Sequence, residues 1–286
     1  MLDICVRNRC DLENVLEFNL ELILVSIVTR VLVSAFIVIL IAKLVVKLGP
    51  SIGGLVAGLP VGLGPGFYFL IEEGNQSFLY QSALHSLIAL SATQFFLMAY
   101  LLLAKFFRPM GCLLISVGIW VFFASIFYQI DFTFLQASFL FVISTIVTRY
   151  IGSFFLVQDR VEKKSESDLI LFLRALAGGL IVAIVTVFAS AIGAQLAGVL
   201  LAFPIAYALI SFNIHKGFGE IIVSRVVYSA ILGTISLAVF CIVFAVFLHM
   251  VPLIYGLFIS LIGSVLVTAL LLLVQTKFQK YRLFLN

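Results

Sequence analysis

The chain has 286 residues, of which 64% are hydrophobic and 10% charged, and its formal net charge is +4. Its mean hydropathy of +1.28 excludes a water-soluble globular protein, because a soluble surface needs far more polar residues. Apolar runs long enough to cross a bilayer recur from Leu20 to Val274, so we predict an all-α integral membrane protein. The basic residues are scattered over many loops, which argues against a nucleic-acid partner.

These apolar runs, separated by short polar breaks, predict about nine transmembrane helices. We place them at residues 20–47, 52–71, 77–104, 110–128, 132–156, 169–191, 195–213, 220–248 and 252–275. The runs at 52–71 and 195–213 are short and rich in glycine, alanine and proline, and re-entrant loops are the alternative for both. Residues 1–19 lack the basic start and short apolar core of a signal peptide, so we expect an extracytoplasmic segment that is kept.

The distribution of basic residues predicts the orientation, since Lys and Arg concentrate in short cytoplasmic loops. If all of these runs cross the membrane, 13 of the 17 basic residues fall on one side. A re-entrant loop at 52–71 would separate Lys43 and Lys47 from Lys105, so the charge pattern favours a crossing helix there. We therefore expect the N-terminus outside and the tail at 276–286 in the cytoplasm.

An internal repeat emerges when the chain is shifted by 144 positions. The matched pairs are Gly49 with Gly193, Gly54 with Gly198, Pro60 with Pro204, Arg30 with Arg174, Gly58 with Ala202, Gly62 with Ala206 and Gly64 with Ala208. The alternative is an accidental alignment between stretches of similar composition.

A duplication would give two four-helix repeats, at 20–128 and 169–275, joined by the extra helix of the linking region 129–168. Because one odd helix separates them, the repeats would have inverted topologies. Many secondary transporters use this arrangement around a site at the bilayer midplane.

Pro60 and Pro204 lie near the middle of their spans and predict breaks in both helices, with Pro65 as a second break in the first. Proline is favoured at the start of a helix, so each is expected to begin a half-helix whose N-terminus points at the bilayer centre. Such an end carries partial positive charge and suits a carboxylate or a phosphate. The alternative is that the prolines only kink the helices while glycines such as Gly54 and Gly58 allow close packing.

One candidate substrate site follows, between the two breaks. Its candidate residues are Arg30, Gly58, Pro60, Gly62, Gly64, Pro65, His85, Arg174, Ala202, Pro204 and Tyr207. Arg30 lies deep in its span and either binds the solute or pairs with Glu72 or Glu73, whereas Arg174 is close enough to the interface to snorkel.

His85 belongs to a thin polar stripe along the span at 77–104. The stripe comprises Ser82, His85, Ser86 and Thr93. It lines a path, or its hydroxyl groups bond to their own helix.

No metal, cofactor or catalytic residue is expected. The four cysteines, Cys5, Cys10, Cys112 and Cys241, show no CxxC pair or zinc spacing, and free thiols or a Cys5–Cys10 disulfide are the two alternatives. Motifs for an ATPase, a metalloprotease or a serine hydrolase are absent, so we do not expect an enzyme. No carboxylate lies in the middle of a span, which weakens a proton-coupled mechanism.

The stretch from Ala197-Gly198 to Phe203-Pro204, followed by Gly217, resembles a motif of the small GlpM-like bacterial membrane proteins. These proteins look like single-repeat relatives. Leu59 replaces the motif's phenylalanine in the first repeat, and the resemblance is confined to this stretch. It implies a protein of the bacterial inner membrane.

Together these patterns predict a secondary transporter of a small anionic or amphiphilic solute, surrounded by the lipid bilayer, with its site at the crossing of the two broken helices. The alternative is a non-transporting membrane component that organises lipid or an envelope-assembly complex.

Overall fold

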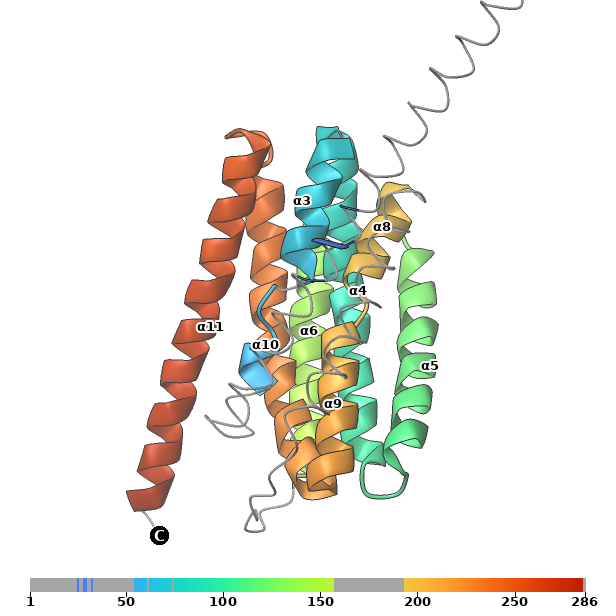
Figure 1. The fold of residues 1–286 in the computed structure, drawn as a ribbon, viewed down its shortest axis with the longest axis vertical. Helices are drawn as coiled ribbons and strands as arrows, with labels where there is room; N and C mark the ends of the chain where they lie inside the picture. The colour runs from blue at the N-terminus through green and yellow to red at the C-terminus, as the bar shows by residue number, and fades with distance from the viewer. Residues whose placement is uncertain are drawn as a thin grey trace, which may run out of the picture.

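The structure is a computed structural model that describes residues 54–60, 62–73, 75–156 and 193–284, together with residues 25, 28, 29 and 32. Within these ranges the chain contains helices and connections but no strand. The helices are α3 (Leu63–Glu73), α4 (Gln76–Leu103), α5 (Pro109–Tyr128), α6 (Phe134–Ser153), α8 (Ala194–Leu201), α9 (Ile205–Phe218), α10 (Glu220–Phe247) and α11 (Leu253–Phe284). Figure 1 shows them aligned in one bundle.

Six helical segments of the described part are long and apolar enough to cross a membrane. They are Gln76–Leu103, Pro109–Tyr128, Phe134–Ser153, Ala194–Phe218, Glu220–Phe247 and Leu253–Thr276. The chain is therefore an all-helical membrane protein. Each of these segments coincides with a predicted span, whereas the predicted spans at 20–47 and 169–191 lie almost wholly outside the described residues.

The long helices α4 and α10 form the centre of the bundle, and they pack against each other. Helix α4 also contacts α5, α6 and α8, while α10 contacts α6, α9 and α11. In the most apolar window of α4, 78% of the residues are buried, against 22% in α5, α6 and α11. The outer helices therefore turn most of their apolar surface to the surroundings, as expected where the solvent is hydrocarbon.

Each outer helix buries one narrow face. The buried residues of α5 recur at every fourth position, at Cys112, Ser116, Trp120 and Ala124, which is the spacing of a single helical stripe. On the other side of the bundle, α3 packs through Phe67 against Phe240 and Phe244 of α10, with ring centroids 5.6 and 5.0 Å apart. The ring contacts fix the short helix α3 against α10.

The two ends of the bundle differ in charge. The end at the bottom of Figure 1, which we call the basic end, carries Lys105, Arg108 and Lys216 in the α4–α5 connection and at the end of α9. The opposite end carries Asp131 and His249.

Candidate functional site

The first interrupted helix breaks at Pro60. The backbone amide of Leu59 donates to the carbonyl of Val56 at 3.0 Å, and the helical pattern resumes with the amide of Gly64 donating to the carbonyl of Pro60 at 2.8 Å. The break expected at Pro60 is therefore present. A second break at Pro65 is not, because Pro65 lies in the first turn of α3, where a missing N–H removes no intrahelical bond.

The second interrupted helix breaks in the same manner between α8 and α9, at Pro204. The amide of Phe203 donates to the carbonyl of Leu200 at 3.1 Å, and the amide of Ala208 donates to the carbonyl of Pro204 at 2.8 Å. Helix α9 therefore starts directly after the proline, in the middle of the bundle, and runs to the basic end (Figure 1). The amide of Ile205 donates to the carbonyl of Phe203 at 2.8 Å, and the positive end of the helix dipole lies at this break.

Each interrupted helix lies against one of the two long helices with almost no space between the backbones. A methyl group added at Gly58 would overlap the backbone of Gly233 on α10, and one added at Gly198 would overlap the carbonyl of Ser82 on α4. The two interrupted helices also meet each other, because a methyl group at Gly66 would overlap the side chain of Leu201. The breaks thus lie side by side between α4 and α10.

Hydroxyl groups from the long helices bond to the carbonyls that precede the breaks. Ser236 of α10 donates to the carbonyl of Gly58, and Thr93 of α4 donates to the carbonyl of Ala202 at 3.2 Å. Thr93 also accepts a hydrogen bond of 3.1 Å from the indole nitrogen of Trp120. The backbone acceptors freed by the breaks therefore have protein partners.

A buried amide, Gln94, joins three helices beside the crossing. Its Nε2 donates to the hydroxyls of Thr145 on α6 and Thr234 on α10, the latter at 3.1 Å, and its Oε1 accepts from Thr148 at 3.0 Å. Gln94, Thr148 and Thr234 are fully buried. Sequence reasoning missed this network; the available signal was a glutamine in the middle of a long apolar run, next to a residue already assigned to the polar stripe.

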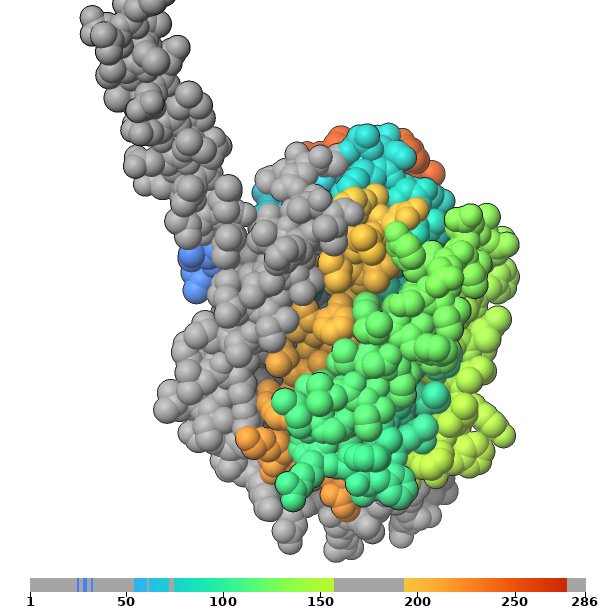
Figure 2. Space-filling model, turned by 90° about the vertical axis from the view of Figure 1, so that its right-hand side faces the viewer, coloured from blue at the N-terminus to red at the C-terminus, as the bar shows by residue number. Residues whose placement is uncertain are grey.

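Polar side chains recur on α4, α5 and α9 between the crossing and the basic end, and we call them the polar file. The rings of Trp120 and Phe203 are 4.8 Å apart, so α5 packs against the break between α8 and α9. One helical turn nearer the basic end lie Ser116 and Tyr207, both buried, and neither hydroxyl has a hydrogen-bond partner in the described part of the chain. Figure 2 shows α5 and the α8–α9 segment side by side on this face.

The file continues to a contact between Tyr100 and His215, whose Oη and Nδ1 are 3.4 Å apart. His215 in turn lines an open pocket of about 470 Å³ at the basic end. We call this the basic pocket; its walls are residues 104–109, 215, 216, 219 and 220. The Tyr100–His215 pair therefore separates the basic pocket from the unpartnered hydroxyls nearer the crossing.

The polar stripe of α4 forms the surface on which α8 lies. Ser82 donates to the carbonyl of Ala194 at 3.0 Å and Ser86 to that of Gly198 at 2.9 Å. His85 is not brought to the crossing, because it lies eight residues from Thr93, about 12 Å along the helix. Its Nδ1 is 2.9 Å from the carbonyl of Gln81 in its own helix.

The remaining residues predicted to bind substrate lie either at the first break or outside the described part of the chain. A methyl group added at Gly62 would meet no atom of the described residues within 4 Å, whereas one at Gly64 would come within 2.9 Å of Leu261. The described residues therefore leave space for a small group at Gly62. Arg30 and Arg174 lie outside the described residues.

The described residues contain no group of three or more histidine, cysteine or acidic side chains placed to hold a metal ion. Cys112 and Cys241 are buried free thiols. No protein-family model, curated protein or solved structure matches the chain.

Proposed function

We propose that the chain is a secondary transporter of a small anionic or amphiphilic solute, bound where the interrupted helices cross. The observation that carries this proposal is the hydroxyl of Tyr207, which is buried at the first turn of α9 without a hydrogen-bond partner in the described part of the chain. An unsatisfied buried polar group costs about 1–3 kcal/mol, and a ligand or water that bonded to the Tyr207 hydroxyl would remove this cost. The N-terminus of α9 adds positive potential, which favours an anion.

We further propose two inverted repeats, at 20–128 and 169–275, which with the linking helix in 129–168 make about nine spans. Helix bounds support this proposal: α4 and α10 have 28 residues each, and α5 and α11 begin at Pro109 and Leu253. These pairs differ by the same shift that relates Pro60 to Pro204.

The contacts between interrupted and long helices also repeat after 144 positions, with the two repeats exchanging roles. Gly198 lies against Ser82 of α4, and Gly54 lies against Val226 of α10. Such an exchange is expected when two inverted repeats cross around a pseudo-twofold axis, as in transporters that alternate access about a central site.

The file from Tyr207 past Tyr100 and His215 supplies a route to the basic pocket. Lys105, Arg108 and Lys216 at its mouth would raise the local concentration of an anionic solute. By the positive-inside rule this end faces the cytoplasm, which supports an N-terminus outside and a C-terminus inside. The resemblance to GlpM-like proteins supports the bacterial inner membrane.

The alternative function is a non-transporting membrane component that organises lipid or an envelope-assembly complex. It is favoured by the bonds that Thr93, Ser236 and Gln94 make at the crossing, because these groups already have protein partners. No described group suggests a catalytic nucleophile, and we retain the proposal that the chain is not an enzyme.

Cysteine accessibility distinguishes the two functions. In a variant without the four native cysteines, Gly62→Cys and Ala206→Cys report on the two breaks, and Ala92→Cys is the dry control because Ala92 is fully buried on α4. Transport predicts that impermeant thiol reagents label both break positions, and that Ala92→Cys stays inert. If both break positions are inert while Phe106→Cys in the α4–α5 connection labels, the crossing is dry and the alternative function is favoured.

A further inference from the structure

The basic pocket has a charge pattern of its own, separate from the crossing. Lys105, Arg108 and Lys216 line it and are all exposed, and none of them forms an ion pair within the described part of the chain. The single carboxylate in the wall belongs to Glu220. The pocket therefore presents an excess of unpaired positive charge.

Two helices begin at this pocket without a side-chain cap. Arg108 is the N-cap of α5 and is followed by Pro109, and Gly219, at a φ of +83°, is the N-cap of α10. Neither N-cap residue bonds to the amides of the first turn through its side chain. Both helix ends therefore add free N–H groups and partial positive charge to that of the three cations.

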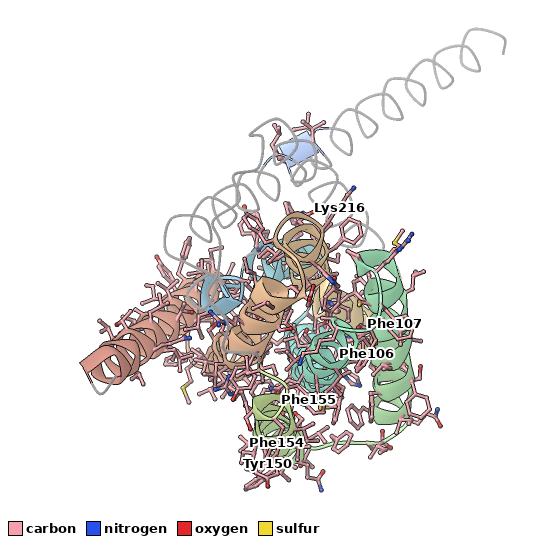
Figure 3. The ribbon with its side chains drawn as sticks, turned by 90° about the horizontal axis from the view of Figure 1, so that it is seen from below. Phe106, Phe107, Tyr150, Phe154, Phe155 and Lys216 are labelled. Atoms are coloured by element: carbon pink, nitrogen blue, oxygen red, sulfur yellow. The ribbon has the colours of Figure 1, made fainter. Side chains whose placement is uncertain are left out.

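Exposed aromatic side chains mark the depth of the pocket in the membrane. Phe106 and Phe107 in its wall are 76% and 47% exposed. At the same end, Tyr150, Phe154 and Phe155 are also exposed, and Figure 3 shows both groups around the rim of the bundle. Tyrosine is enriched at the level of the lipid headgroups, so Tyr150 at this end supports an opening of the pocket near the lipid phosphates.

We infer that the basic pocket binds a phosphate group, carried by an anionic lipid headgroup or present as free phosphate. Three cations and two helix N-termini against one carboxylate match a phosphate's charge and its several acceptor oxygens. The inference does not depend on transport, because a ligand held at this end need not pass the Tyr100–His215 pair.

The test counts lipids bound to the purified full-length chain by native mass spectrometry, in micelles containing phosphatidylglycerol or phosphatidylcholine. The wild-type chain is expected to retain phosphatidylglycerol in preference to phosphatidylcholine. The triple variant Lys105→Gln, Arg108→Gln, Lys216→Gln should lose this preference by on the order of tenfold or more, since each cation near an anionic headgroup contributes to binding. Glu220→Gln should strengthen retention, because it removes the repulsive charge from the same wall.

Two further arms separate the sources of the phosphate. If the ligand is a lipid, Phe106→Ala with Phe107→Ala weakens retention, and inorganic phosphate does not raise the unfolding temperature. If the ligand is free phosphate, inorganic phosphate raises the unfolding temperature of the wild type but not of the triple variant. The variant Phe106→Ala with Phe107→Ala then responds to phosphate as the wild type does.

The control is Lys105→Arg with Lys216→Arg, which keeps the charge and should bind as the wild type does. The inference is overturned if the triple variant binds phosphatidylglycerol and inorganic phosphate as the wild type does while its unfolding temperature is unchanged. It is also overturned if Glu220→Gln weakens binding.

Discussion

The two long helices α4 and α10 each hold an interrupted helix, and they do so with different chemistry. Helix α4 holds α8 with hydroxyls: Ser82 and Ser86 bond to the carbonyls of Ala194 and Gly198. Helix α10 donates one such bond, from Ser236 to the carbonyl of Gly58, and places Gly233 directly against the backbone of Gly58. The same crossing geometry therefore rests more on hydroxyl bonds at α4 and more on two facing glycines at α10.

The largest effect is expected on the backbone side of this comparison. Gly58→Ala should destabilise the protein by about 3 kcal/mol, because the new methyl group overlaps backbone atoms of Gly233, which cannot move aside as a side chain can. The thermal unfolding midpoint in detergent measures this. Gly62→Ala is the matched control, since its methyl group meets no atom of the described part of the chain within 4 Å, and equal midpoints for the two variants would contradict the close contact.

Gln94→Leu should have the next largest effect, about 2 kcal/mol, because it breaks the bonds to Thr145, Thr148 and Thr234 inside the membrane. Ser91→Ala on the same helix is the control. The Ser91 hydroxyl is buried without a partner in the described part of the chain, so its removal should leave stability unchanged or raise it. A loss in Ser91→Ala as large as that in Gln94→Leu would show that the network does not set the stability.

A smaller difference is expected between hydroxyls on the two long helices. Ser82→Ala with Ser86→Ala should cost about 1 kcal/mol, because interhelical hydrogen bonds in membranes average about 0.6 kcal/mol each. Ser229→Ala on α10 should cost almost nothing, since its hydroxyl bonds only to the carbonyl of Val226 in its own helix. If chemical denaturation gives the same loss on both helices, the contrast between the two interfaces is wrong.

The smallest effect on stability is expected at Tyr207. Tyr207→Phe removes an unpartnered hydroxyl and should change the free energy of unfolding by less than about 0.5 kcal/mol, whereas Tyr100→Phe loses the contact with His215 and should be the less stable variant. Thermal unfolding compares the pair. A clear destabilisation by Tyr207→Phe would show that the hydroxyl has a partner within the protein and is not available to bind a solute.

The sequence predicted six of the nine proposed spans where the described part has long apolar helices, because length and apolar composition alone define them. The spans at 77–104, 110–128 and 220–248 agree with α4, α5 and α10 to within one residue. The predicted span at 252–275 agrees with the apolar segment Leu253–Thr276 to within one residue, and helix α11 itself continues to Phe284, since a fall in hydropathy marks where a helix leaves the hydrocarbon and not where it ends.

The candidate site was predictable where a residue acts on its own backbone and not where it acts through a neighbour. Pro60 and Pro204 break their helices for reasons that are local. Pro65 does not, because its effect depends on where the new helix starts. The role of Gln94 depends on which helices lie beside α4. The hydrogen bonds from Ser82 and Ser86 to α8 depend on tertiary packing, which no local pattern encodes.

Transport as we propose it needs a route from the basic pocket to the crossing, closed where Tyr100 meets His215. The most direct test measures the rate at which an impermeant thiol reagent labels Ala206→Cys from each side, with and without Tyr100→Ala. If the route exists, Tyr100→Ala accelerates labelling of Ala206→Cys severalfold from the basic end and leaves labelling from the opposite end unchanged. Unchanged labelling from the basic end, in a variant that still unfolds cooperatively, would contradict the route.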